Sequence, residues 1–348
     1  MPRCVARKSG SAAKARAWRA RKTVKYLDCD QFLGISVEHL NKTVVYHVPV
    51  MGQQTMAFLQ PGAGGLFLDG TAGGGGHTRM MLEAGAGVVA LDQDPEALAE
   101  CRRQLAEFGD RVRLVEANFQ DVDAALDHLG EGRLFHGALL DLGVSSHHLD
   151  SAGRGFSFQQ EGPLDMRMGP AIKQTAAEVV NTMDAAELTS IFHQYGEEPR
   201  ARQIAAHLVR VRKNRLFKTT LQLADAVGEI LPRRGPKHPA TRVFQALRMH
   251  VNDELGALRR ALLEIPPHLA PGARFAVITF HSLEDRIVKV FFREHSREWI
   301  DRPEWPEPRR NPDRLFRLLT SHPITAAARE TQQNPRARSA KLRVVEKL

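Results

Sequence analysis

The chain has 348 residues, 43% hydrophobic and 26% charged, a composition typical of globular proteins that are long enough for two domains. No apolar run reaches the roughly 18–20 residues of a bilayer span, so we expect no membrane segment. The three scattered cysteines, Cys4, Cys29 and Cys101, exclude a disulfide framework or a zinc site and suit a reducing cytoplasm.

The net charge of +9 is concentrated in three segments. Residues 1–27 hold nine basic and no acidic residues, residues 200–248 carry a net +10, and the last twenty residues carry +4. Such segments favour a phosphate-binding face if they converge, although solvated helix faces explain the charge equally well. We interpret residues 1–40 as a basic extension, disordered or weakly helical, with a mitochondrial-type presequence as the alternative.

Strands and helices are predicted to alternate from residue 65 to residue 141. They follow in the order Gly65–Asp69, Thr78–Gly85, Val88–Asp92, Pro95–Phe108, Arg111–Ala117, Val122–Leu129 and Gly137–Asp141. This alternation predicts a parallel sheet with right-handed crossovers, an α/β fold.

The alternation then stops, because residues 150–265 contain helical periods and no convincing strand. These helices are expected at Ala176–Thr182, Ala185–Tyr195, Pro199–Lys213, Thr220–Ile230 and Ala240–Leu263. A strand at Phe275–Phe280, a helix at Leu283–Glu294, an irregular stretch at 296–335 and a β-segment at Lys341–Val345 complete the chain. We therefore predict one α/β domain, residues 41–149 and 266–348, with an all-helical insertion at 150–265.

A glycine-rich turn follows the first predicted strand, at Asp69-Gly-Thr-Ala-Gly-Gly-Gly-Gly76-His77. Glycines in such a turn more often serve only the conformation of the turn, but they also let the backbone approach a ligand. Asp92 ends the next strand, seventeen residues after Gly75, where a carboxylate accepts ribose hydroxyls. Thr78 breaks the dinucleotide pattern, so the site favours S-adenosylmethionine over NAD. The candidate cofactor residues in the turn are Asp69, Gly73, Gly75, Gly76 and His77.

The fourth predicted strand runs into Asp141-Leu-Gly-Val-Ser-Ser146. An amino-methyltransferase must bring its acceptor to the methyl group at this edge. A carboxylate here accepts hydrogen bonds from a ring amine and draws its lone pair towards the methyl. Asp141 and Ser145 are therefore catalytic candidates, although capping of the next segment explains them as well.

These motifs together resemble the MraW family, the bacterial small-subunit rRNA (cytosine-N4) methyltransferases. The resemblance covers residues 46–348. It is carried, in chain order, by His47–Val50, Asp69–His77, Leu91–Pro95, Leu139–Ser146, Arg154–Phe158, Gly162–Met168, Arg242–Arg248, Phe280–Ile287 and Asn334–Arg343.

The resemblance implies a class I S-adenosylmethionine-dependent methyltransferase fold, Rossmann-like with a mostly parallel sheet. It implies N4-methylation of a cytosine in the decoding (P-site) region of 16S rRNA, within the small ribosomal subunit. It also implies that the cofactor is contacted by Gly75, Gly76, His77, Asp92, Phe119, Asp141 and His148. The family commonly has Pro-Gln where this chain has His147-His148, so an imidazole replaces an amide there.

The segment His281-Ser-Leu-Glu-Asp285 is hydrolase-like in composition but lacks a nucleophile elbow. We interpret Ser282 as a helix cap with Glu284 and Asp285 in the first turn, and His281 as a further catalytic candidate that lines the acceptor pocket. The histidines have no paired spacing beside cysteines, so we expect no metal site. The loop Gly162–Met168 is expected to fold over the cofactor, anchored by Asp165 or Arg167.

The helical insertion is the predicted rRNA-recognition domain. Its clustered candidates are Arg210, Arg212, Lys213, Arg215 and Lys218. The expected partner is the small ribosomal subunit in the cytoplasm, with no membrane and with the enzyme a monomer or homodimer. Two alternatives stay open: a DNA amino-methyltransferase, and a non-catalytic ribosome-assembly factor that retains the fold.

Overall fold

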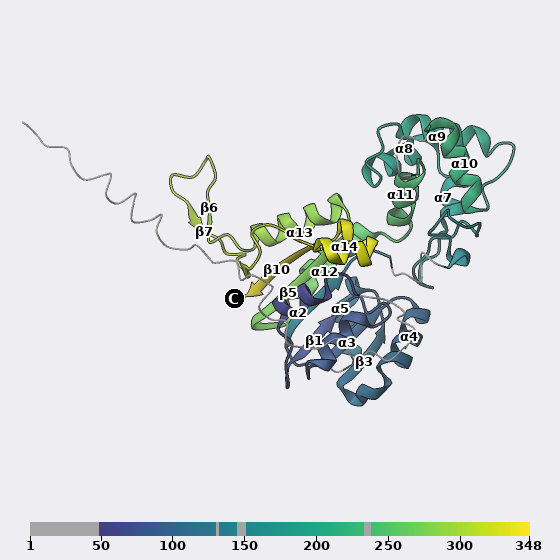
Figure 1. The fold of residues 1–348 in the computed structure, drawn as a ribbon. Coiled ribbons are helices and arrows are strands. Elements are labelled where there is room, and N and C mark those ends of the chain that lie inside the picture. Colours follow the sequence, from purple (N-terminus) through teal and green to yellow (C-terminus); the bar gives the residue numbers. More distant parts are fainter. Residues whose placement is uncertain (1–48, 130–131, 145–150, 233–237) are drawn as a thin grey trace, which may run out of the picture. The chain divides into compact units, whose positions relative to one another are not determined.

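The computed structural model describes residues 49–129, 132–144, 151–232 and 238–348. A sheet forms its largest element, with the strands in spatial order β3-β2-β1-β4-β5-β10-β8 and β9 beside β10 (Figure 1). The first five strands in this order run parallel and β10 is antiparallel to β5. The strands are β1 Leu66–Asp69, β2 Gly87–Asp92, β3 Val112–Glu116, β4 Phe135–Asp141, β5 Leu269–Thr279, β8 Phe316–Leu318, β9 Ile324–Thr325 and β10 Lys341–Lys347. The prediction of a mostly parallel sheet with helices is confirmed.

Helices cover both faces of this sheet because successive side chains of a strand point to opposite sides. Leu66 and Leu68 of β1 pack in a core with α5, α12 and α13, while Phe67 between them packs in a second core with α2, α3 and α4. The sheet is therefore buried on both faces, as its nearly continuous apolar strands require. The covering helices are α2 Gly52–Leu59, α3 Gly76–Glu83, α4 Pro95–Leu105, α5 Val122–Leu129, α12 Glu254–Glu264 and α13 Ser282–Glu294.

A group of helices lies between β4 and β5 in the sequence and has a hydrophobic core of its own (Figure 1, teal to green). Capping boxes begin several of them, for example Thr175 with Glu178 and Asp184 with Glu187. Between 151 and 265, the described residues contain only an isolated bridge from Pro163 to Thr219 and no strand. The helices are α7 Ala176–Thr182, α8 Ala185–Gln194, α9 Ala201–Val211, α10 Thr220–Ile230 and α11 Thr241–Val251.

The single helix predicted over Ala240–Leu263 is wrong, because the chain breaks between α11 and α12. Asp253 adopts a left-handed conformation with φ of 45°, and Asn252 precedes it with φ of −97°. Beyond the break, Leu258 and Leu262 pack in the core of the sheet. The domain division stays a prediction, and these cores favour its boundary near Asn252 over residue 265.

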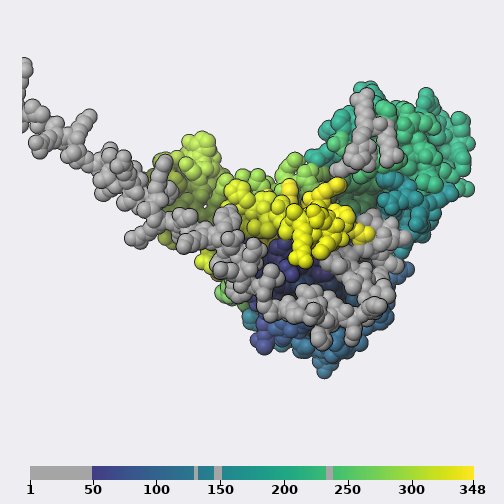
Figure 2. All heavy atoms as spheres, viewed as in Figure 1, coloured from purple at the N-terminus to yellow at the C-terminus, as the bar shows by residue number. Residues whose placement is uncertain are grey.

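The C-terminal stretch expected to be irregular holds short elements instead. Residues 299–310 contain the paired strands β6 Trp299–Ile300 and β7 Arg309–Arg310, and α14 spans Ala328–Gln333. Glu330 of α14 accepts hydrogen bonds from the Met51 N–H at 2.5 Å and the Gln54 side chain at 3.2 Å. The yellow C-terminal residues accordingly lie against dark purple ones in Figure 2. Within the described ranges, no helix is long and apolar enough to cross a membrane.

Candidate active site

A cavity of about 560 Å³ lies at the carboxyl ends of β1, β2 and β4. Ligands of open parallel sheets bind at this edge, outside the carboxyl ends of the strands. One main part of its lining comes from the turns after β1, β2 and β3, and the other main part comes from the end of β4, residues 156–168, α11 and the end of β5. We call these two parts the cofactor side and the acceptor side. The predicted site residues that line the cavity are Gly73, Gly76, His77, Asp92, Phe119, Asp141 and His281.

The glycine-rich turn connects β1 to α3 and forms the floor of the cofactor side. Gly75 is the N-cap of α3, with φ of 83°, a left-handed conformation that favours glycine. A Cβ at this position would also lie 3.3 Å from the Cys101 sulfur. Gly75 therefore permits the conformation of the turn and its close packing against Cys101, and it is not among the residues that line the cavity.

Asp69 lies beneath the turn and does not line the cavity either. One carboxylate oxygen accepts the Thr78 hydroxyl at 2.6 Å, and the other accepts the Thr71 N–H at 3.1 Å. Burial raises the pKa of Asp69 to about 6, against the lowering effect of these hydrogen bonds. Asp69 thus supports the turn from below, its contact with the cofactor stays a prediction, and no motif in the sequence indicated its pairing with Thr78.

Asp92 ends β2 and faces the cavity. Its carboxylate accepts the Gly73 N–H at 2.8 Å through one oxygen and the Asp94 N–H at 2.9 Å through the other. These backbone bonds fix the orientation of the Asp92 carboxylate at the edge of the cavity.

An aromatic ring completes the cofactor side. Phe119 begins the short turn after β3, where Asn118 caps that turn and donates to the Gln93 side chain at 2.8 Å. All three residues line the cavity. Gln93 follows Asp92 directly in the Leu91–Pro95 motif, which is the signal that could have identified it.

Asp141 lies at the junction of the two sides. Its N–H donates to the Thr71 hydroxyl at 2.7 Å, which ties the end of β4 to the glycine-rich turn. Its Oδ2 lies 3.5 Å from His77 Nδ1, and among the described residues its buried Oδ1 has no hydrogen-bond partner. Burial, and then the charges of Asp69 and Glu284, raise the pKa of Asp141 well above its usual value. A carboxyl oxygen without a partner thus lies at the wall of a cavity.

His77 supports this carboxyl from the first turn of α3. Its Nε2 lies 3.1 Å from the Val50 carbonyl oxygen, which can only accept, so Nε2 carries a hydrogen. Its Nδ1 then faces the Asp141 carboxyl group. A neutral His77 ring accepts a hydrogen bond from a protonated Asp141, and a protonated ring donates one to an ionised Asp141. His77 also lines the cavity, and the cofactor contact that the resemblance implies for it stays a prediction.

The acceptor side is rich in aromatic side chains that come from distant parts of the sequence. The Phe158 and Phe244 rings meet edge to face at 4.8 Å between centroids. These positions lie in the Arg154–Phe158 and Arg242–Arg248 motifs, but nothing in those motifs indicated a role. Ser145 and His148 lie outside the described residues. The acceptor side is lined by Val144, Phe156, Phe158, Met168, Phe244, Arg248, Phe280 and His281.

His281 is the N-cap of α13, which corrects the interpretation of Ser282 as the cap. Its Nδ1 accepts the Glu284 N–H at 3.4 Å, and its Nε2 lies 3.0 Å from the Glu284 carboxylate. The Ser282 hydroxyl instead donates to Glu197 at 2.7 Å. Although burial opposes ionisation, hydrogen bonds from His281 and the Phe280 N–H hold the pKa of Glu284 below its usual value.

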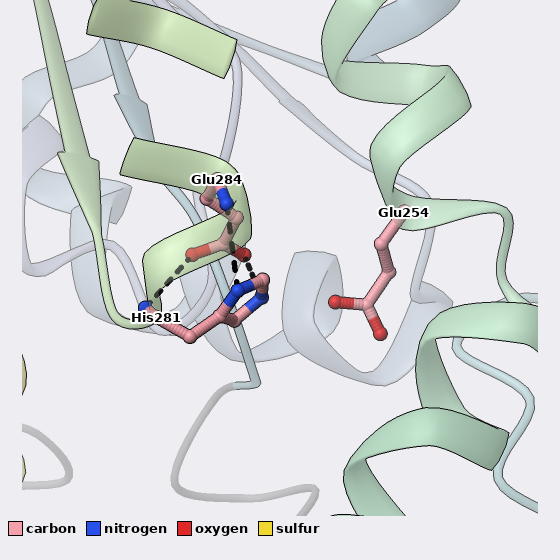
Figure 3. A group of neighbouring side chains, drawn as sticks. All are labelled: Glu254, His281 and Glu284. Carbon is pink, nitrogen blue, oxygen red and sulfur yellow. Dashed lines mark hydrogen bonds and ion pairs between the residues drawn. The ribbon is translucent and has the colours of Figure 1, made fainter. Parts of the chain in front are cut away.

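Glu254 points towards the same imidazole from the start of α12 (Figure 3). Glu254, His281 and Glu284 come close enough together to hold a metal ion. However, the Arg248 guanidinium already binds both Glu254 oxygens, at 2.7 and 2.8 Å. Its positive charge would oppose a cation, so we interpret the cluster as an ion-pair network at the wall of the acceptor side.

The loop residues Asp165 and Arg167 do not line the cavity. They form a bidentate pair with one another at 2.8 Å, and this pair lowers the pKa of Asp165 despite burial. Met168 at the end of the loop does reach the cavity. The Asp165 and Arg167 side chains therefore hold the loop through each other and through the Ile172 carbonyl oxygen, and their role as anchors over the cofactor stays a prediction.

The basic candidates of the helical insertion fall into two groups. Arg212 donates to the Val180 and Met183 carbonyl oxygens, at 2.6 and 2.5 Å, and so caps the C-terminal end of α7. Arg210 is exposed and contacts His207 at 2.8 Å. Lys213, Arg215 and Lys218 are exposed.

One family model and several known proteins match nearly the whole described chain. The family model described as "MraW methylase family" matches residues 44–348. The chain is 45% identical over 311 residues to the "Ribosomal RNA small subunit methyltransferase H" of Heliobacterium modesticaldum, covering 88% of this chain and 99% of the relative. It is 49% identical to the protein of the same name from Syntrophotalea carbinolica, covering 89% and 100%. A solved rRNA methylase from Streptococcus thermophilus aligns over 85% of this chain and 95% of its own, with a TM-score of 0.38 at 12% identity, too low to carry an argument.

Proposed function

The chain belongs to the MraW methylase family, and from this premise we propose that it methylates the N4 amine of a cytosine in the decoding (P-site) region of 16S rRNA. The methyl donor is S-adenosylmethionine, as the sequence predicted, and the substrate is the assembled small subunit in the cytoplasm. The observation that carries the proposal is the Oδ1 of Asp141, which is buried at the wall of the cavity where β4 ends and has no hydrogen-bond partner in the described part of the chain.

The cofactor side fits S-adenosylmethionine. Asp92 offers carboxylate lone pairs for the two ribose hydroxyls, and Phe119 offers an apolar ring for the adenine. When bound, S-adenosylmethionine supplies an electrophilic methyl group on a positively charged sulfur. The cavity of about 560 Å³ also leaves space for an acceptor base beside it.

Asp141 orients the acceptor in this proposal. A cytosine amine is a weak nucleophile because its lone pair is delocalised into the ring. The ionised Asp141 carboxylate accepts an N–H of the amine at Oδ1 and localises that lone pair towards the methyl. After transfer the nitrogen must lose a proton, and Oδ1 is the acceptor already in contact with it. The raised pKa of Asp141 suits this proton transfer.

The acceptor side holds the base in place. Phe158 and Phe244 form an apolar wall against which a base extruded from its stack can pack. The ion pair of Arg248 with Glu254 and the capping contacts of His281 fix the polar end of this wall. His281 is thus proposed as a lining residue and Ser145 stays a prediction from the sequence.

The exposed basic residues of the helical insertion are proposed to bind rRNA phosphates. Lys213, Arg215 and Lys218 can reach phosphate groups because their side chains are exposed. Arg210 is also exposed, but its guanidinium contacts His207 as well. Arg212 is removed from the proposed set, since its guanidinium is held by α7. Such contacts give affinity without reading sequence, so the choice of base falls to the cavity.

Transfer of labelled methyl groups tests the proposal. The wild-type protein is offered small subunits, naked 16S rRNA and duplex DNA, and the modified base is identified by mass spectrometry of nucleosides. We expect N4-methylcytidine in small subunits at one position. Preference for duplex DNA would favour a DNA amino-methyltransferase, and binding of small subunits without transfer would favour an assembly factor; either result contradicts the proposal.

A further inference from the structure

The residues 152–169, which we call the 152–169 loop, fold back tightly on themselves next to the cavity. A Cβ at Gly162 would lie 1.8 Å from the Ala152 carbonyl oxygen, so only glycine permits this approach of the two arms. The Met166 N–H donates to the Arg154 carbonyl oxygen at 3.0 Å and joins the arms again. Phe156, Phe158 and Met168 of this loop line the acceptor side.

One end of the loop is packed against the corner that follows Asp92. A Cβ at Gly169 would lie 2.7 Å from the Gln93 carbonyl oxygen, which shows how closely the two backbones approach. Gln93 itself lines the cofactor side. The loop therefore touches the residue next to the proposed ribose-binding carboxylate.

Arg154 bridges this corner to the loop. Its Nη1 contacts the buried Asp94 carboxylate at 3.0 Å and the exposed Glu96 carboxylate at 2.9 Å. Its Nη2 donates to the carbonyl oxygens of Arg167 and Met168, both at 3.3 Å. Asp94 also caps α4, through the Glu96 N–H at 3.0 Å, and its own N–H binds Asp92. A chain of direct contacts thus runs from Asp92 through Asp94 and Arg154 to Met168.

The other side of the loop is bound to the helices of the insertion, at the end of α11 and the start of α10. The buried Asn252 accepts the Met168 N–H and donates to the Met166 carbonyl oxygen, both at 2.8 Å. The Leu164 N–H donates to the Lys218 carbonyl oxygen and the Thr220 N–H to that of Gly162, both at 2.9 Å. Lys218 is one of the exposed residues proposed to bind phosphate.

From these contacts we propose that Arg154 is a positioning residue that couples the two sides of the cavity: occupancy of the cofactor side orders the 152–169 loop, and this ordering prepares the acceptor wall and the helical insertion for RNA. A ligand on Asp92 restrains the Asp92–Asp94 corner, and Arg154 transmits the restraint because its guanidinium binds the corner and the loop at once. Coupling between two ligands is reciprocal, so bound RNA must raise cofactor affinity by the same factor. The RNA half of this inference rests on the proposed function, whereas the ordering of the loop does not.

Hydrogen–deuterium exchange tests the coupling without RNA. In the wild type, S-adenosylhomocysteine is expected to slow amide exchange in residues 154–168 several-fold. In Arg154→Ala, the same ligand is expected to bind while exchange in this segment stays unchanged. Equal slowing in both proteins would overturn the inference.

Matched variants separate the bridge from a loss of folding. Asp94→Asn neutralises the buried partner of Arg154 but keeps the Arg154–Glu96 ion pair and a good cap for α4, so it should lose part of the slowing even if Arg154→Ala is unstable. Arg154→Lys keeps the charge and one contact, and should restore part of the slowing. Arg167→Ala removes an arginine whose side chain contacts Asp165 and the Ile172 carbonyl oxygen but not the Asp94 corner, and should behave as the wild type. A loss of slowing in Arg167→Ala as large as that in Arg154→Ala would contradict the specific role.

The RNA half is measured as the ratio of S-adenosylhomocysteine affinities with and without saturating small subunits. We expect a ratio of about fivefold or more in the wild type, in the usual range of coupling between sites, and a ratio near one in Arg154→Ala. An unchanged ratio in the variant would overturn the inference. A wild type that neither binds nor methylates small subunits would instead contradict the proposed function, and the exchange result would stand by itself.

Discussion

The two sides of the cavity are built in opposite ways. On the cofactor side, the polar groups belong to turns within residues 69–119, and backbone N–H groups hold the Asp92 carboxylate through both oxygens. On the acceptor side, the wall comes from residues 141–281, and the Asp141 carboxyl keeps one oxygen without a partner among the described residues. Local backbone geometry thus shapes the side proposed for the cofactor, whereas the side proposed for the acceptor is formed by side chains that only the packing of the helical insertion brings together.

The largest expected effect separates the two sides at Asp141. Asp141→Ala should lower kcat about 100- to 1,000-fold, because it removes the acceptor for the amine N–H. The affinity for S-adenosylhomocysteine should change far less. Single-turnover methylation and calorimetry measure the two effects, with Asp127→Ala as the control at an exposed acid. A large loss of cofactor affinity with little change in kcat would move Asp141 to the cofactor side.

The same residue predicts the pH dependence of the rate. Only the ionised carboxylate can take up the proton that the amine nitrogen loses, and the pKa of Asp141 is raised well above its usual value. The rate should therefore fall as pH decreases through this raised pKa, while cofactor binding stays nearly constant. A profile of single-turnover rates for the wild type and Asp141→Asn checks this, since the variant should lack that limb. A limb present in both proteins would assign the titration to another group.

Asp69 should affect stability more than binding. The pKa of Asp69 is about 6 in the folded protein, above the ordinary 3.8. The contribution of Asp69 to the free energy of unfolding is therefore fully present below about pH 4 and is lost as pH rises to about 6. The loss amounts to roughly 3 kcal/mol in the free energy of unfolding. Asp69→Asn should remove this part of the pH dependence, measured by urea unfolding at a series of pH values, whereas Asp127→Asn should keep it. Identical slopes in Asp69→Asn and the wild type would contradict the burial argument.

Asp92 should define the cofactor side. Asp92→Ala removes charge-assisted hydrogen bonds to the ribose hydroxyls, which are worth about 1.5–3 kcal/mol, and should weaken S-adenosylhomocysteine binding about 10- to 100-fold. Small-subunit affinity measured without cofactor should stay near that of the wild type. Calorimetry and filter binding measure the two, with Asp110→Ala as the control at an exposed acid. Unchanged cofactor affinity would place the ribose partner elsewhere.

The smallest expected effect is on the salt dependence of small-subunit binding, and it concerns the exposed basic residues of the helical insertion. Replacing Lys213, Arg215 and Lys218 by alanine should reduce the salt slope of small-subunit binding by about 0.7–0.9 for each lost phosphate contact. Cofactor affinity should not change. Alanine at Lys289, Arg293 and Arg297 gives the same change in net charge on and beside α13 and should leave the slope nearly as it was. Equal slopes in all three proteins would mean that the first cluster is only a solvated face.

Arg212 shows why charge in the sequence does not identify a contact. It lies among four other basic residues and looks equivalent to them, yet its guanidinium is bound by the carbonyl oxygens of Val180 and Met183, 32 and 29 residues earlier. The break at Asn252 and Asp253 was equally invisible, because apolar residues keep a helical period on both sides of it. In both places the deciding contact is with a segment far along the chain.

The sequence by itself determined the alternation of strands and helices, the glycine-rich turn and the place of Asp92, because periodicity, turn chemistry and the right-handed crossover act over short separations. It also placed Asp141 at the end of its strand, where parallel strands present their carboxyl ends together. Only the tertiary structure decided that Asp69 lies under the turn, that Phe158 meets Phe244, and that Arg154 joins Asp94 to Met168. These contacts depend on how the loop and the helices between β4 and β5 pack back against the sheet, and no local pattern encodes a side-chain pairing across such a distance.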